Sequence, residues 1–127
     1  MENGKQTVIL ISKNLVFLPR IEAAAGSTMK VRRLTDVDQT ESLVNNSDVR
    51  AILVDLEEEP KLWATVLKEL AIHFKTQLNK VTMVAYGPHE DERSMNKART
   101  LGCNLVLPKG AFINQLRNIL HPKKETV

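Results

Sequence analysis

Five short apolar segments, separated by longer segments with helical periodicity, set the pattern of this 127-residue chain. Four of the apolar segments are almost continuously apolar and rich in Val, Ile and Leu, which is typical of strands buried on both faces of a parallel sheet. The segment at residues 29–35 instead alternates apolar and basic side chains, which predicts an edge strand. The predicted strands are residues 7–12, 29–35, 49–55, 81–87 and 104–108.

The segments between the strands predict helices. Residues 60–78 carry apolar side chains at the i, i+3, i+4, i+7 spacing of one helix face, and Pro60 suits a first turn. Asp38 and Glu41 have the spacing of a capping box, which predicts a short helix from there to about Asn45. The other predicted helices run from near Phe17 to Gly26, from Glu90 to Leu101 with Gly102 after it, and from about Phe112 to Leu120.

Strand–helix units repeated along the chain predict an α/β fold, in which a parallel sheet carries helices on both faces. The length indicates a single domain, residues 1–127, with an ordered core of about residues 7–121. A net charge of +3 without a basic stripe argues against nucleic-acid binding. Cys103 is the only cysteine, which excludes an internal disulfide and favours a buried, unreactive thiol. No segment has the length of a membrane span or the pattern of a signal peptide, so we expect a cytoplasmic protein.

Candidate chemistry gathers where the predicted strands end. Asp55 closes the third strand, at the edge where open α/β folds bind ligands. Its alternative role is structural, as a cap for a neighbouring loop or as the ion-pair partner of Lys13 or Lys109. His89 follows the fourth strand, and it is either a ligand-binding group or an exposed loop histidine.

Two stretches make the chain resemble the CheY-like receiver domains of response regulators. AILVD (51–55) is similar to the strand that carries the phospho-accepting aspartate, and TLGCNLVLPKGAF (100–112) is similar to the segment that places a lysine before the last helix. The resemblance covers Thr7 to Leu120 and implies a flavodoxin-like (CheY-like) three-layer sandwich with (βα)5 order. It also implies that Asp55 is the phospho-acceptor and that Lys109 contacts the phosphoryl group. Tyr86 and Gly87 then occupy the place of the receiver's switch threonine or serine.

The chain departs from the receiver pattern at the metal site. Receivers hold Mg²⁺ with two acids after the first strand, and here Ser12 and Lys13 stand in their place. The family's Lys-Pro dipeptide is inverted to Pro108-Lys109. These departures indicate an atypical or pseudo-receiver in which phosphoryl acceptance at Asp55 stays open but is disfavoured. We expect no cofactor and no metal site, with Asp55 alone left as a weak Mg²⁺ ligand.

Two functional hypotheses follow. The first is a stand-alone signalling module of the response regulator type that is not an enzyme and binds a protein partner, such as a histidine kinase or a downstream regulator. The resemblance implies a partner surface on the fourth helix, fifth strand and fifth helix, made up of Arg99, Val106, Lys109, Ala111 and Arg117. The second is a small flavodoxin-like ligand-binding domain or enzyme with an anion site. That anion site would consist of Ser12, Lys13, Gly87 and His89. The first hypothesis is our prediction.

Overall fold

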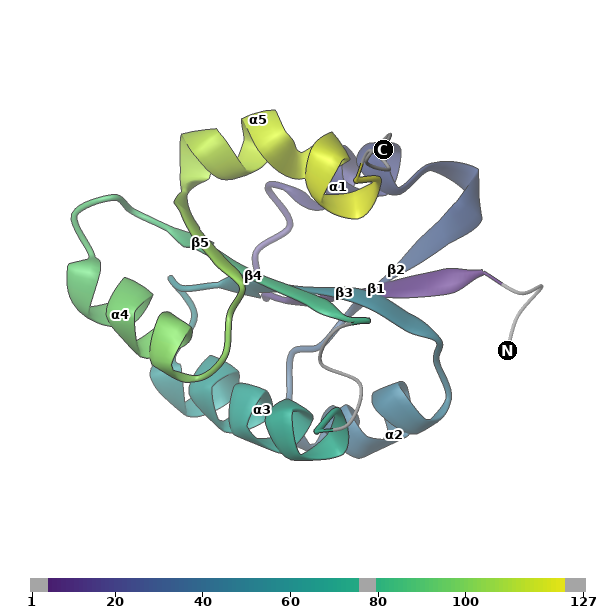
Figure 1. The fold of residues 1–127 in the computed structure, drawn as a ribbon, viewed down its shortest axis with the longest axis horizontal. Helices are drawn as coiled ribbons and strands as arrows, with labels where there is room; N and C mark the ends of the chain where they lie inside the picture. Colours follow the sequence, from purple (N-terminus) through teal and green to yellow (C-terminus); the bar gives the residue numbers. More distant parts are fainter. Residues whose placement is uncertain (1–4, 76–79, 123–127) are drawn as a thin grey trace, which may run out of the picture.

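The computed structural model describes residues 5–75 and 80–122, and its five strands form one parallel sheet in the order β2-β1-β3-β4-β5 (Figure 1). The strands are β1 (Gln6–Ile11), β2 (Met29–Arg33), β3 (Val49–Asp55), β4 (Thr82–Gly87) and β5 (Leu105–Pro108). The helices are α1 (Leu18–Ala25), α2 (Thr40–Asn45), α3 (Pro60–His73), α4 (Glu92–Thr100) and α5 (Lys109–Leu120), with 3-10 turns η1 (Gly26–Thr28) and η2 (Val37–Gln39). The flavodoxin-like (βα)5 sandwich predicted from the sequence is confirmed.

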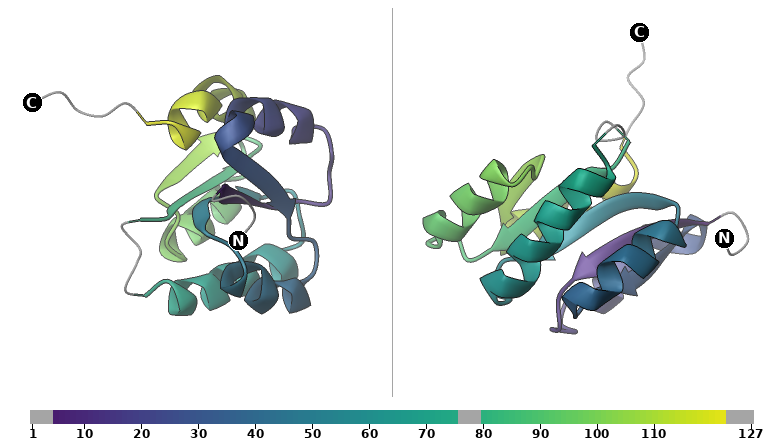
Figure 2. Two further views of the ribbon diagram at one scale, coloured as in Figure 1. Left: turned by 90° about the vertical axis from the view of Figure 1, so that its right-hand side faces the viewer. Right: turned by 90° about the horizontal axis from the view of Figure 1, so that it is seen from below.

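The sheet is the middle of three layers. Helices α1 and α5 cover one face, and α2, α3 and α4 cover the other (Figures 1 and 2). Alternate residues of the central strands enter opposite cores, since Ile52 and Val54 pack toward α3 whereas Ala51 and Leu53 pack toward α1 and α5. Burial on both faces explains why β1, β3 and β4 read as continuous apolar runs.

Glycine ends two of the helices, as predicted. Gly26 and Gly102 have φ angles of 70° and 108°, in the left-handed region where a side chain is strained. Helix α3 ends at His73 rather than at residue 78; residues 76–78 of the predicted helix lie outside the described residues. None of the described helices is long and apolar enough to span a membrane.

The capping box before α2 is not the predicted pair Asp38–Glu41. Asp36 has extended backbone angles, so its carboxylate accepts a hydrogen bond from the Asp38 amide at 2.9 Å. The Gln39 side chain in turn accepts from the Asp36 amide at 3.0 Å. Asp38 lies inside the 3-10 turn, where its backbone has the wrong geometry to cap. The capping box therefore lies two residues earlier than predicted and opens the 3-10 turn η2, which leads into α2 at Thr40.

Strand β5 corrects a second prediction, that of a strand buried on both faces. It is the outer edge of the sheet opposite β2, and Leu105 is 39% exposed. Val106 and Leu107 are only half-buried, because α4 and α5 cover this edge incompletely. An apolar edge strand is therefore open to contact from outside.

Candidate functional site

Asp55 lies at the C-terminal edge of the sheet with a side chain that is almost entirely buried. It pairs in register with Tyr86 of β4, and Ser12 directly follows the neighbouring strand β1. The Ser12 hydroxyl donates a hydrogen bond to Asp55 Oδ2 at 2.8 Å, and the Glu57 amide donates to Asp55 Oδ1 at 2.9 Å. Each carboxylate oxygen therefore accepts a hydrogen bond from an uncharged group, and the bond from the Glu57 amide caps the loop after β3. Of the structural roles that the sequence left open for Asp55, the hydrogen bond from Glu57 corresponds to the loop cap.

Lys109 begins α5 and forms its ion pair with Glu57 rather than with Asp55. The contact joins Lys109 Nζ to Glu57 Oε1, and the two side chains are 40% and 48% exposed. The expected tether from Lys109 to Asp55 is corrected accordingly. Glu57 reaches the ammonium at the surface, where pairing requires less desolvation than at the buried Asp55.

Burial controls the ionisation of the two titratable groups in the site. It raises the pKa of the Asp55 carboxyl above its ordinary value of 3.8, while the hydrogen bond from Ser12 and the positive charge of Lys109 act in the opposite direction. The pKa of Tyr86 is also raised, first by burial and then by the negative charge of Asp55. The Tyr86 hydroxyl therefore stays neutral throughout the physiological pH range.

A pocket of about 120 Å³ opens over Asp55. Its lining residues are Asn14, Val16, Phe17, Asp55, Tyr86 and Lys109. The Tyr86 ring stacks on Phe112 with 4.1 Å between centroids, and Phe17 lies 5.7 Å from Tyr86. The pocket thus combines a carboxylate with an aromatic wall. Sequence reasoning missed Asn14, Val16 and Phe17, although the loop after β1 ends at the same edge of the sheet as Asp55 and could have indicated them.

The structure brings only some of the predicted site residues to this pocket. Lys13 is exposed, and its backbone amide donates to Glu58 Oε2 at 2.5 Å. Gly87 is buried against Leu56, and a Cβ at this position would lie 3.0 Å from Leu56 Cβ. His89 does not lie on the rim of the pocket: its ring is 81% exposed and pairs with Glu90 at 3.0 Å. The residues proposed for an anion site therefore do not line one common pocket.

The predicted partner surface is also divided. Arg99 of α4 shares a surface hollow of about 380 Å³ with His89. Val106 on β5 and Ala111 on α5 are half-buried. Arg117 instead lines a groove of about 300 Å³ between α1 and α5, across from Arg20. Arg117 therefore belongs to a different face from Arg99.

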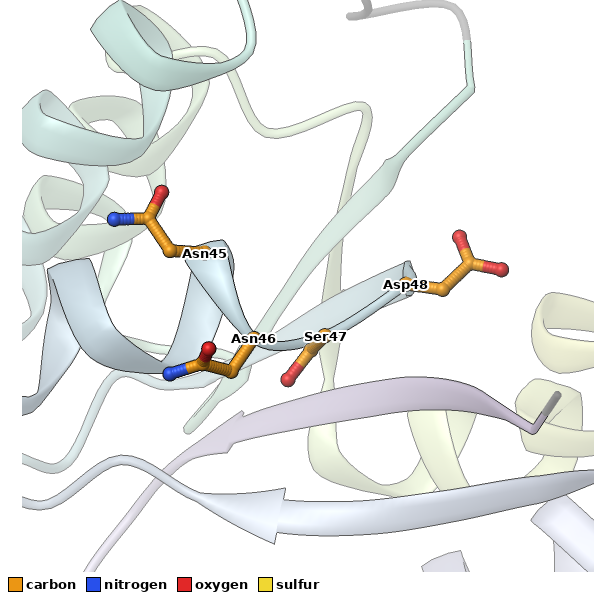
Figure 3. Close-up of a pocket in the computed structure, with 4 residues that line it drawn as sticks. All are labelled: Asn45, Asn46, Ser47 and Asp48. Atoms are coloured by element: carbon orange, nitrogen blue, oxygen red, sulfur yellow. The ribbon is translucent and has the colours of Figure 1, made fainter. Parts of the chain in front are cut away.

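A larger hollow of about 450 Å³ lies at the turn between α2 and β3, at the opposite end of β3 from Asp55 (Figure 3). It is lined by Asn45, Asn46, Ser47 and Asp48. Figure 3 shows the Asn45 and Asp48 side chains pointing away from each other, so they do not converge on a ligand. Asn46 instead donates to the neighbouring Ser42 hydroxyl at 3.3 Å. The geometry gives this hollow no binding chemistry.

The residues around Asp55 do not fit a Mg²⁺ ion. Mg²⁺ requires near-octahedral oxygen ligation that normally relies on carboxylates. Here both Asp55 oxygens already accept hydrogen bonds, and Ser12 directs its hydroxyl at Asp55. Within residues 5–75 and 80–122, no three His, Cys, Asp or Glu side chains gather in a group that could hold a metal ion.

The chain is similar to solved receiver domains in fold. No protein-family model and no curated protein matches it. The phosphorylated cyanobacterial phytochrome response regulator RcpA is 21% identical, with a TM-score of 0.66 over 91% of this chain and 89% of that one. The Mn²⁺-bound response regulator Rcp1 is 15% identical, with a TM-score of 0.68 over 96% and 99%. The Ssk1 receiver domain of Saccharomyces cerevisiae, solved with the phosphotransfer protein Ypd1, is 15% identical, with a TM-score of 0.67 over 92% and 90%. The fold of this chain is that of the CheY-like receiver domains, as the sequence resemblance implied.

Proposed function

We propose that this chain is a receiver-like signalling module that acts by binding a protein partner, and that it does so without phosphoryl transfer to Asp55. The observation that carries the proposal is the occupied Asp55 carboxylate. One oxygen accepts from the Ser12 hydroxyl and the other from the Glu57 amide. Each oxygen therefore donates electron density to a hydrogen bond, which makes the carboxylate a weaker nucleophile toward a phosphoryl donor.

The charges around Asp55 also oppose phosphoryl transfer. Transfer depends on positioning and on cations that stabilise the developing negative charge. Lys109 is the cation at this pocket, and Glu57 pairs with it. A phosphoryl group adds roughly 1.5 to 2 negative charges. Glu57 and Glu58 lie two and three residues after Asp55 in the chain, so the added charge would meet two further carboxylates.

The surface best suited to a protein partner lies on α4 and β5. Leu105 is 39% exposed and Val106 is half-buried on an edge strand, while Arg99 on α4 is exposed. An incompletely covered apolar edge strand offers backbone and apolar contacts to a partner, and arginine is enriched among the residues that contribute most to binding. A histidine kinase or a downstream regulator is the class of partner that the receiver fold favours.

The phosphoryl part of the proposal is tested by an amide NMR titration with beryllofluoride, a phosphoryl mimic, with and without Mg²⁺. We expect no Mg²⁺-dependent shifts at Ser12, Asp55, Tyr86 or Lys109. The Asp55→Asn variant, whose carboxylate is replaced by an amide, is the matched control. Shifts at these residues that require Mg²⁺ and vanish in Asp55→Asn would establish a working phospho-acceptor and refute this part of the proposal.

The partner-binding part is tested by placing a photo-crosslinking amino acid at position 105. The control places the same amino acid at Ile72, an apolar residue of α3 that is 77% exposed and lies outside the proposed surface on α4 and β5. We expect a discrete crosslinked protein from position 105 and none from position 72. Equal crosslinking from both positions, or none from position 105, would contradict the assignment of this surface.

A further inference from the structure

The Asp55 pocket holds a buried carboxylate whose hydrogen bonds come from neutral donors. Asp55 is 5% exposed, yet it lines a pocket of about 120 Å³, which has room for several water molecules. A carboxylate can accept about four hydrogen bonds. The Ser12 hydroxyl and the Glu57 amide supply two of them, one to each oxygen. The carboxylate therefore keeps accepting capacity on the side of the pocket.

The charged groups around the pocket leave a negative balance. Lys109 lines the pocket, but its ammonium is paired with the Glu57 carboxylate. Lys13 is exposed and does not line the pocket, and Glu58 accepts a hydrogen bond from the backbone amide of Lys13. Arg33, whose guanidinium donates to the Lys13 carbonyl, lies outside the lining as well. With Lys109 paired to Glu57, the Asp55 carboxylate is the charge in the pocket lining that no cation pairs with. A positive ligand is favoured here over an anionic one.

The pocket wall and its lip indicate what kind of cation fits. Phe17 and Tyr86 line the wall, and aromatic rings attract organic cations through their π-electrons. Val16 lines the pocket and is 70% exposed, and its chain neighbour Leu15 is 56% exposed, so two adjacent apolar side chains are open to solvent in this loop. A cation on an apolar stem would contact the lip with its stem and Asp55 with its head.

From this combination we infer that the Asp55 pocket binds a guanidinium or ammonium head group, supplied by an arginine or lysine side chain of a partner protein. The pocket that holds the phospho-acceptor in receiver domains would bind a cation in this chain. The assignment to a partner protein rests on the proposed function; the cation site itself does not. Burial raises the pKa of Asp55, and a bound cation would lower it again, so binding would release a proton near that pKa.

The test is an amide NMR titration of the described chain with methylguanidinium chloride and with butylammonium chloride. Sodium chloride at the same ionic strength is the reference. We expect saturable shifts at Asn14, Val16, Phe17 and Tyr86 with the organic cations and not with sodium. A peptide containing arginine between two leucines should bind at least several-fold more tightly than methylguanidinium, because its apolar neighbours contact Leu15 and Val16. Equal affinities would assign the site to a free small cation instead of a partner side chain and overturn that part of the inference.

A pair of variants distinguishes binding at the Asp55 carboxylate from a general effect of the protein's net charge. Asp55→Asn removes the charge at nearly constant shape, and we expect at least a tenfold loss of affinity for methylguanidinium. Asp48→Asn makes the same chemical change at the opposite end of β3 and should bind like the wild type. Phe17→Leu keeps an apolar side chain but removes a ring, and should weaken binding a few-fold. If Asp55→Asn failed to fold, Phe17→Leu would still test the site.

Unchanged affinity in both pocket variants, or shifts no larger than those with sodium chloride, would overturn the inference. Beryllofluoride shifts without cation shifts would overturn it in favour of a phosphoryl site. Loss of crosslinking at Leu105 alone would count against the partner surface on α4 and β5 and leave the cation site standing.

Discussion

Removing the Ser12 hydroxyl should destabilise the protein in a way that depends on the charge of Asp55. Ser12→Ala takes away the 2.8 Å hydrogen bond to Asp55 Oδ2 and leaves a buried carboxylate oxygen without its donor. A hydrogen bond to a charged group contributes about 1.5–3 kcal/mol, against about 0.5–1.5 kcal/mol for a neutral one. We therefore expect Ser12→Ala to lower the free energy of unfolding by about 2 kcal/mol at pH 7.

The pH dependence of this loss follows from the pKa of Asp55. The Ser12 hydrogen bond lowers that pKa, so its removal raises the pKa further and makes the ionised form more costly. Below pH 3.8, the ordinary pKa, Asp55 is protonated in both proteins and only a neutral hydrogen bond is lost. The destabilisation should therefore grow as the pH rises through the pKa of Asp55 and then level off.

Urea denaturation at several pH values measures the effect. With a slope of about 1–3 kcal/mol per molar urea, the loss at pH 7 should move the midpoint by about 1 M. Thr7→Val is the matched control, because the Thr7 hydroxyl is equally buried but has no hydrogen-bond partner among the described residues. We expect that change to cost little at any pH. A Ser12→Ala loss below about 0.5 kcal/mol, or one that stays constant with pH or persists unchanged in an Asp55→Asn background, would refute the reasoning.

Three further predictions concern nearby positions. Asp55→Asn should raise the free energy of unfolding at neutral pH and lose that advantage in acid. Burial raises the Asp55 pKa, so the wild type is destabilised as the pH rises from 3.8 through that pKa. Thermal unfolding at pH 3 and pH 7 measures the difference. Gly87→Ala should cost about 1–3 kcal/mol, because its new Cβ would lie 3.0 Å from Leu56 Cβ; Gly110→Ala, with open space around it, is the control in urea denaturation. Cys103 should react slowly with a thiol reagent at pH 8, because burial raises its pKa to about 12, and unfolding in urea should restore an ordinary rate; fast reaction of the folded protein would contradict its burial.

The fold was predictable because its signals are local and repeated. Continuous apolar runs predicted β1, β3 and β4, and glycine signals predicted the ends of α1 and α4. The alternation of apolar and basic residues correctly placed β2 at an edge. The composition of β5 did not reveal its edge position, since an apolar strand has the same sequence whether or not helices cover it.

The candidate site was predictable only as a neighbourhood. The ends of strands placed Ser12, Asp55 and Tyr86 together, because the carboxyl ends of parallel strands share one edge. The choice of Glu57 over Asp55 as the partner of Lys109 depends on how the loop after β3 turns, which no residue spacing specifies. For the same reason His89 was expected at the pocket and lies outside it.

The Lys109–Glu57 ion pair has a consequence for motion. It joins the loop after β3 to the first residue of α5, two segments that are far apart in the chain. A half-exposed ion pair contributes no more than about 1 kcal/mol, which favours the closed loop over an open one by at most about fivefold. Ions in solution weaken this preference. The Lys109–Glu57 ion pair therefore breaks and re-forms readily, and the fraction of time for which the loop is open rises with ionic strength.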